Sequence, residues 1–342
     1  MFDHCLIGLH PLKQTDRASG MCRKESEALF GVGCAITQLS FTRSEFITDK
    51  PAEQKGMSIS GAQPKLSLRI SADKELVVTP NNGEYILKPS PEAYPGLAEN
   101  EHAIMLCMAY LKFAIPKFAL IPFMPESKDS GPELAFIIKR YDRHSGVKIH
   151  QEQLDGAMGI TDKYGNIDGK QTVSYERAAK FLVKNVDSSL IAKYDILQRV
   201  VCAYLLGNND MHLRNLGVVY SANGDLSIAP VYDFVSVVPY PSSFSEVLAL
   251  PLLEKEESDY GIADGLDSHI GEYTGHDFLE FAEGMGLNRN LAAKRIRLIT
   301  GKVEKLIEII NGSYMINKDK RSVCEYISRR ATLLNTLDIA DA

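Results

Sequence analysis

The prevailing hydrophobic period of the chain changes near residue 141, from the alternation typical of strands to the spacing typical of helices. Before it, short runs of alternating apolar and polar residues bounded by turn residues predict strands of an antiparallel sheet at residues 65–70, 75–79, 84–88, 118–123 and 134–141. One run with helical spacing, residues 97–113, interrupts these strands. After it, helical spacing predicts helices at residues 174–186, 188–206, 276–285, 288–310 and 319–337, with two short strands within 215–236.

These patterns predict an α+β chain with two lobes. The N-terminal lobe, residues 1–145, is expected to be rich in strands, and the C-terminal lobe, residues 146–342, to be mainly helical. With 342 residues, 45% of them hydrophobic, the chain has enough apolar side chains for a large core, which excludes a disordered tail or a disulfide-stapled mini-protein. The formal net charge of -6 counts against a protein that coats nucleic acid.

The cysteine pattern predicts a reducing compartment, and we expect the chain in the cytoplasm. The chain has six cysteines without a CxxC pair, which does not resemble a disulfide framework. The first residues lack the basic segment and the long apolar run of a signal peptide, and the best apolar run elsewhere, residues 200–206, is too short to span a membrane.

A dense polar cluster, GNNDMHLRN at residues 207–215, carries the strongest chemical signal. Asn215 follows Asp210 by five residues, and Asp233 in PVYDF follows eighteen residues later, which is the spacing of the base and the metal ligands in protein kinases. Phosphoryl transfer needs a carboxylate that accepts the hydroxyl proton, and amide and carboxylate oxygens that bind Mg²⁺. Either segment alone is equally compatible with an ordinary turn, but the two together favour a kinase.

The first lobe offers residues that could hold the phosphates of ATP. Lys88 ends an apolar strand, and Glu101 lies thirteen residues later at the start of the expected helix, where a kinase glutamate pairs with a strand lysine. Upstream, residues 56–65 (GMSISGAQPK) form a candidate phosphate loop, whose small residues, Gly61 and Ala62 among them, let backbone N–H groups approach phosphates. This loop departs from the GxGxxG pattern, which indicates a divergent kinase.

Together, the segments SISGAQPK, ILKPS, AENEHA, IKRYDR, GNNDMHLRN and PVYDF resemble the HipA-type serine/threonine kinase toxins. The resemblance is closest to HipT, the short kinases of the tripartite HipBST toxin–antitoxin systems, and extends from about residue 5 to the final helix. It implies a bilobal protein-kinase-like fold and a kinase that uses ATP and Mg²⁺. The roles that it implies are a catalytic base at Asp210, Mg²⁺ ligands at Asn215 and Asp233, phosphate binding by Lys88 oriented by Glu101, a position near the γ-phosphate for His212, adenine contacts at Lys139 and Tyr141, and autophosphorylation at Ser58 and Ser60.

The resemblance also implies partners. HipA-type kinases carry an N-terminal subdomain that this chain lacks, and in the HipT-like systems a separate protein, HipS, resembles that piece and acts as the antitoxin, while HipB is the DNA-binding partner. We therefore expect a HipS-like protein to bind the N-terminal lobe, and tryptophanyl-tRNA synthetase to be the substrate. A small-molecule kinase and an inactive pseudokinase scaffold remain as alternatives.

The first 55 residues carry the weakest signal. Cysteines and histidines occur there, but their spacing matches no zinc pattern, so we expect them to be core and surface residues. The residues concerned are His4, Cys5, His10, Cys22 and Cys34.

Overall fold

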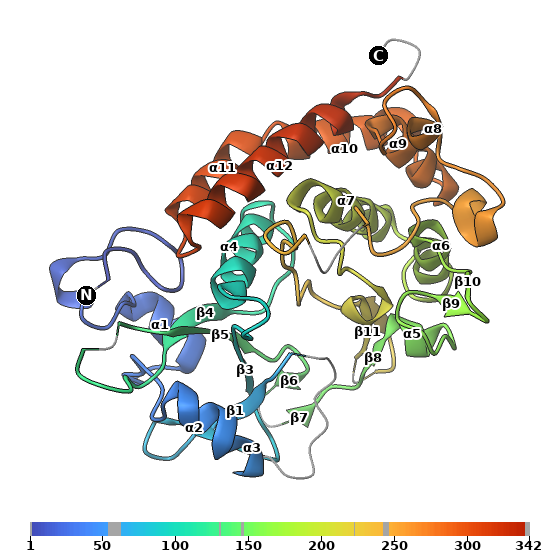
Figure 1. Ribbon diagram of the computed structural model, residues 1–342. Helices are drawn as coiled ribbons and strands as arrows, with labels where there is room; N and C mark the ends of the chain where they lie inside the picture. Colours follow the sequence, from blue (N-terminus) through green and yellow to red (C-terminus); the bar gives the residue numbers. More distant parts are fainter. Residues whose placement is uncertain are drawn as a thin grey trace. The chain divides into compact units, whose positions relative to one another are not determined.

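The computed structural model describes residues 2–53, 63–129, 131–144, 147–221, 223–241 and 246–338, and combines helices with antiparallel sheets (Figure 1). The chain divides into two compact units. The first comprises Met1–Leu106, Ile115–Lys148 and Gly312–Met315, and the second Cys107–Ala114, Ile149–Asn311 and Ile316–Ala342. No helix in the described ranges combines the length and the apolar character that a membrane span requires.

A five-stranded antiparallel sheet forms the centre of the first unit, in the strand order β2-β1-β3-β5-β4. All five residues of β4 are buried, as are the first five of β5, because these strands consist almost entirely of apolar residues. Strand β3 lies between β1 and β5 and is hydrogen-bonded on both sides, which fixes its position. The strands are β1 (Leu66–Ile70), β2 (Leu76–Val78), β3 (Tyr85–Pro89), β4 (Phe118–Pro122) and β5 (Leu134–Lys139), with a separate hairpin of β6 (Arg143–His144) and β7 (Val147–Lys148).

Short helices that the sequence did not predict occupy the N-terminal segment. They are α1 (Arg23–Phe30), α2 (Arg43–Thr48) and α3 (Lys50–Glu53), preceded by the 3-10 turn η1 (Gln14–Asp16). Helix α2 begins with a capping box, in which the Thr42 hydroxyl accepts from the Glu45 N–H and the Glu45 carboxylate accepts from the Thr42 N–H. The Tyr85 hydroxyl donates to the Leu29 carbonyl at 2.9 Å and so ties α1 to β3. Long-range contacts of this kind, rather than local periodicity, position the segment.

The second unit is built around α7 (Leu190–Leu206), which contacts α6, α9, α10 and α12. Ser174 caps α6 and Ser189 caps α7 by accepting backbone N–H groups, and these caps set where the two helices begin. Three strands of this unit form a small antiparallel sheet in the order β12-β11-β8. The remaining elements are β8 (Gln151–Gln153), α5 (Leu154–Ala157), β9 (Asn166–Ile167), β10 (Lys170–Gln171), α6 (Tyr175–Asn185), η2 (Leu213–Asn215), β11 (Gly217–Tyr220), β12 (Leu226–Ile228), η3 (Glu254–Asp259), α8 (Asp264–Asp267), α9 (Gly275–Gly284), α10 (Arg289–Thr300), α11 (Val303–Gly312) and α12 (Asn317–Asn335), and α4 (Leu97–Tyr110) is divided between the units.

The single helix expected over residues 288–310 is wrong, because two helices occupy this range. Helix α10 ends at Thr300, where Gly301 is the C-cap and donates to the Arg297 carbonyl, and α11 begins at Val303. The apolar periodicity continues across the break, so the pattern alone gave one helix. Glycine, the residue at the break, is a poor helix former.

The left-handed glycine at the end of α7 generates a stability prediction. Gly207 has φ 73°, and a Cβ there would lie 2.4 Å from Val238 Cγ2, whereas Gly224, at φ 85°, has open space around that position. Gly207→Ala is expected to cost the left-handed strain of about 1–2 kcal/mol and the clash in addition, while Gly224→Ala costs only the strain. Urea denaturation of both variants measures the difference, and equal losses would show that the contact with Val238 relaxes freely.

Candidate active site

A buried ion pair joins strand β3 of the five-stranded sheet to helix α4. The Lys88 ammonium on β3 lies 2.7 Å from Glu101 Oε1 on α4, and the two residues are 5% and 0% exposed. The Lys88 Nζ also lies 5.8 Å from the centre of the Phe136 ring. Two opposite charges buried in apolar surroundings are stable only when they are paired. The structure therefore brings together the two residues that the sequence had paired by their spacing.

The start of α4 is anchored next to this pair. The Ser90 hydroxyl, two residues after Lys88, accepts from the Ala98 N–H at 2.9 Å. Gln63, at the described edge of the candidate phosphate loop, donates from Nε2 to the Pro89 carbonyl at 3.0 Å. The chain that follows this loop is thus attached to the strand that carries Lys88. The loop residues predicted to contact phosphate or to be phosphorylated, Ser58, Ser60, Gly61 and Ala62, lie outside the described residues.

The predicted adenine contacts, Lys139 and Tyr141, lie at the end of β5 and directly after it. Lys139 is the last residue of β5, and its Nζ lies 5.8 Å from the centre of the Tyr85 ring. Tyr141 is half-buried. The turn after it is held by Asp142, a buried carboxylate that accepts from the guanidinium groups of Arg140 and Arg143. These two cations lower the pKa of Asp142 against the opposing effect of burial, so that the carboxylate stays ionised.

The polar loop of the second unit follows α7 directly. Gly207 ends the helix, and the Asp210 N–H then donates to Asn208 Oδ1 at 3.2 Å. The Tyr175 hydroxyl of α6 donates to the Met211 carbonyl at 2.7 Å. The Asn215 amide donates from Nδ2 to the Asp210 carbonyl at 2.8 Å, which closes the loop on itself. Asp210 and Asn215 are thus held at a fixed separation by the backbone that lies between them.

Cationic and polar side chains gather around the Asp210 carboxylate. Around Oδ1 lie Lys163 Nζ at 3.8 Å, His212 Nε2 at 3.7 Å and the Tyr164 hydroxyl, which donates at 3.4 Å. Burial and the charge of Asp233 raise the pKa of Asp210, Lys163 and Tyr164 lower it, and the balance is a pKa of about 6. A carboxyl with such a pKa accepts a proton well near neutral pH, as a general base must.

His212 remains neutral at physiological pH. Burial and the nearby Lys163 lower its pKa to about 4, and its ring lies edge-on to Tyr164 with the ring centres 5.5 Å apart. Within the described part of the chain, its buried Nδ1 has no hydrogen-bond partner. A buried polar atom without a partner is uncommon in proteins and is compatible with a contact to a substrate.

Asp233 lies in a strained backbone conformation near the same loop. Its φ of 54° is in the left-handed region, which non-glycine residues rarely adopt and which often marks functional sites. The neighbouring Tyr232 hydroxyl donates to the Arg214 carbonyl at 3.0 Å, so the PVYDF segment is attached to the polar loop. Its charge raises the pKa of both Asp210 and His212.

The side chains of Asn215 and Asp233 are suitable ligands for a magnesium ion. The Asn215 amide is fixed through Nδ2, so its Oδ1 is the end of the amide that can bind a cation. Asp233 supplies a carboxylate whose field reaches the same loop. Hard oxygen donors of these two types are what Mg²⁺ takes in kinases.

Lys163 and Tyr164 were not predicted from the sequence. They lie more than 45 residues before Asp210, between α5 and β9, in a stretch without a recognisable motif. The Leu213 N–H donates to the Lys163 carbonyl at 3.0 Å, and this backbone contact brings the segment to the loop. Only the folded chain reveals them as neighbours of Asp210.

Comparisons with known proteins identify the family. The profile of the HipA-like C-terminal domain matches residues 57–307. A putative kinase of Haemophilus influenzae is 46% identical over 339 residues, 98% of each chain. The chain belongs to the HipA-like kinase family. The serine/threonine-protein kinase toxin HipA of Shewanella oneidensis is 25% identical over 285 residues, which are 78% of this chain and 60% of HipA.

Solved structures confirm the α+β kinase-like fold expected from the sequence. The HipA of Shewanella oneidensis, determined in a complex with HipB and operator DNA, matches with a TM-score of 0.58 at 22% identity and covers 82% of this HipA-like kinase. The alignment covers 64% of that HipA chain. The proinflammatory kinase CtkA of Helicobacter pylori matches with a TM-score of 0.53 at 18% identity, over 83% of this chain and 92% of CtkA.

The buried ion pair generates a double-mutant prediction. Lys88→Met leaves the Glu101 carboxylate buried beside an apolar side chain, and breaking such a pair costs about 3–5 kcal/mol of the free energy of unfolding. The double variant Lys88→Met/Glu101→Leu is expected to recover a large part of this loss, because no buried charge remains. Chemical denaturation measures both, with the exposed Lys128→Met as control. A double variant as unstable as Lys88→Met would show that the charge is not what destabilises the single variant.

The pKa of Asp210 generates a prediction for the pH profile. If this carboxylate must be ionised to accept a proton, kcat/KM falls as pH drops through about 6. Lys163→Met removes a cation that lowers this pKa, so the acidic limb is expected to move to higher pH. Phosphate transfer from labelled ATP across a pH series tests this, with the exposed Lys170→Met as control. An acidic limb at the same pH in both variants would contradict the assignment.

Proposed function

We propose that the chain is an ATP- and Mg²⁺-dependent serine/threonine protein kinase. The observation that supports it most is the environment of Asp210: a carboxylate with a pKa raised to about 6, contacted by Lys163, Tyr164 and His212 in a loop closed by Asn215. The kinases among the relatives support the same reaction class.

In the proposed reaction, Asp210 takes the proton of a serine or threonine hydroxyl. The hydroxyl oxygen forms a bond to the γ-phosphorus of ATP while the bond from that phosphorus to the β–γ bridging oxygen breaks, and ADP leaves with the electron pair. Asn215 and Asp233 would hold Mg²⁺, which would supply positive charge against the phosphate oxygens. Neutral His212 can donate a hydrogen bond near the γ-phosphate without adding a charge.

The first unit is proposed to hold the nucleotide. Lys88 binds the phosphates, and Glu101 keeps its ammonium in place and charged. Lys139 and Tyr141 contact the adenine, with Gly61 and Ala62 presenting backbone N–H groups to the phosphates. These roles rest on the resemblance and on the buried pair at 2.7 Å. We retain residues 1–145 and 146–342 as the nucleotide-binding and catalytic lobes.

Autophosphorylation at Ser58 and Ser60 is proposed to restrain the kinase. Each phosphoserine would add about -1.5 to -2 charge at neutral pH to the loop that binds the phosphates of ATP. Such a loop repels the nucleotide. The proposal rests on the resemblance of SISGAQPK to the phosphorylated loop of the family.

In the cell, we propose a HipT-like toxin of a HipBST system that acts in the cytoplasm. Its target is tryptophanyl-tRNA synthetase, whose phosphorylation would stop translation and growth. The partners are a HipS-like antitoxin that binds the N-terminal lobe and a HipB-like DNA-binding protein. The region of similarity to the Shewanella oneidensis HipA covers 60% of HipA, and the HipS-like partner rests on the resemblance to the HipT-like systems.

Mass spectrometry after incubation with ATP and Mg²⁺ tests the reaction, the target and the loop together. The protein is incubated alone and with tryptophanyl-tRNA synthetase, beside Asp210→Asn and the exposed control Asp225→Asn. We expect phosphate on the synthetase and on Ser58 or Ser60 with the wild type and with Asp225→Asn, and a loss of at least about 100-fold in rate with Asp210→Asn, the usual contribution of a general base.

Other results would revise the proposal in distinct ways. Phosphate on the loop alone would keep the kinase and reject this synthetase as substrate. Transfer to a small molecule but to neither protein would indicate a metabolite kinase. No transfer with the wild type, under conditions where ATP binds, would indicate an inactive scaffold.

A further inference from the structure

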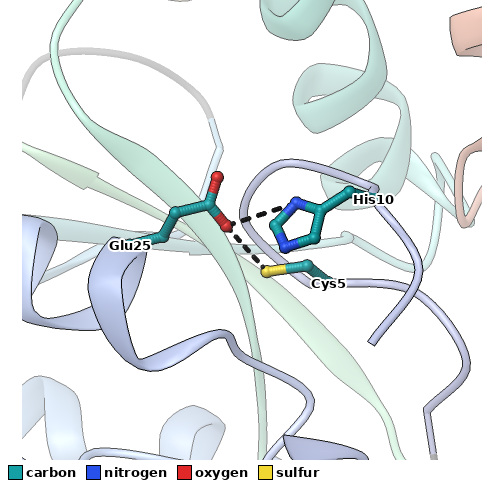
Figure 2. A group of neighbouring side chains, drawn as sticks. All are labelled: Cys5, His10 and Glu25. Atoms are coloured by element: carbon teal, nitrogen blue, oxygen red, sulfur yellow. Dashed lines mark hydrogen bonds and ion pairs between the residues drawn. The ribbon is translucent and has the colours of Figure 1, made fainter. Parts of the chain in front are cut away.

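Three side chains of different chemistry converge in the N-terminal segment, and none of them is among the proposed kinase residues. The Cys5 thiol donates to Glu25 Oε2 at 3.0 Å, and His10 Nδ1 lies 3.6 Å from the same oxygen. One ligand atom from each of the three residues lies within 4.8 Å of the others. Figure 2 shows the sulfur and the imidazole both directed toward the Glu25 carboxylate. Cys5 is fully buried, whereas His10 and Glu25 keep part of their surface exposed.

Backbone hydrogen bonds and a helix hold the residues that carry these three side chains. The Cys5 N–H donates to the His10 carbonyl at 2.8 Å, and the Leu9 N–H to the Cys5 carbonyl at 2.9 Å, so residues 5–10 form a closed loop. Glu25 belongs to the first turn of α1. Gly8 allows the close approach of loop and helix, because a Cβ there would lie 2.5 Å from Glu25 Oε1.

The surroundings of the sulfur can stabilise a thiolate. The N–H groups of Ile7 and Cys22 point at Sγ from 3.4 and 3.5 Å, and such donors stabilise negative charge on sulfur. A coordinated cation deprotonates a thiol outright.

We propose that Cys5, His10 and Glu25 bind one Zn²⁺ ion, with water in the fourth position. Sulfur, imidazole and carboxylate are all zinc ligands, and a thiolate makes hard ions such as Mg²⁺ or Ca²⁺ unsuitable. On binding, the Sγ proton leaves to solvent, and the thiolate, the carboxylate and the neutral imidazole then balance the charge of the ion. The exposed side of His10 gives the metal and the water access.

The distances fit a tetrahedral site. Zinc bonds of about 2.0–2.3 Å place neighbouring ligand atoms about 3.3–3.6 Å apart. The 3.6 Å distance from Nδ1 to Oε2 lies within this range, the 3.0 Å distance from sulfur to Oε2 is shorter, and all three ligand atoms lie within 4.8 Å of one another. The ion would then join the N-terminal loop to α1.

Metal titration of the full-length protein tests the site directly. The protein is stripped with a chelator and titrated with Zn²⁺ in competition with a chromophoric chelator, and in parallel with Co²⁺, whose thiolate charge-transfer band reports a sulfur ligand. We expect one equivalent of Zn²⁺ and a cobalt–thiolate band. Cys5→Ser, His10→Ala and Glu25→Gln should each weaken zinc binding at least 10-fold, and Cys5→Ser should abolish the band.

Each variant has a matched control from the same segment, namely Cys34→Ser, His4→Ala and Glu27→Gln, which should bind zinc as the wild type does. Thermal denaturation in chelator shows whether a variant is folded, and added Zn²⁺ should raise the melting temperature of the wild type and of the controls only. Wild-type protein that binds no zinc would overturn the proposal. So would zinc binding that survives all three ligand substitutions, since the ion would then lie elsewhere.

Discussion

The burial of one ammonium and one carboxylate places the strictest demand on the first unit. Lys88 and Glu101 are both nearly inaccessible to water, so each needs the other at hydrogen-bond distance. That distance is held because β3 is hydrogen-bonded to strands on both sides and because Ser90 anchors the start of α4. The strand order around β3 and the position of α4 therefore allow the charged Lys88 side chain to remain buried.

In the second unit, hydrogen bonds hold a loop that is rich in polar side chains. Helix α7 is buried along most of its length and ends at a left-handed glycine, after which the chain turns into a loop crowded with polar side chains. Hydrogen bonds from Tyr175, Tyr232 and Asn215 to carbonyl groups of this loop satisfy its backbone. Within this loop, burial and the charge of Asp233 raise the pKa of Asp210, whereas Lys163 lowers it. The proton affinity of Asp210 is the balance of these effects.

The N-terminal segment shows that a cluster with ligand chemistry can lie outside the kinase machinery. Two of its side chains come from a tight loop closed by backbone hydrogen bonds, and the third comes from the first turn of a helix. If zinc binds there, the ion stabilises a segment that has few regular elements, which is a common way for short segments to gain rigidity. The same lobe is where we propose that the antitoxin binds.

The sequence by itself determined the features that depend on neighbours along the chain. Strand alternation, helical spacing and the intervals between Lys88 and Glu101, and between Asp210, Asn215 and Asp233, are properties of local geometry, and they sufficed for the fold class and the family. The tertiary structure decided what comes from distant segments. Lys163 and Tyr164 reach Asp210 through a backbone contact, and Glu25 completes a cluster that cysteine and histidine spacing alone did not predict. Such contacts depend on how the elements pack, which no local pattern encodes.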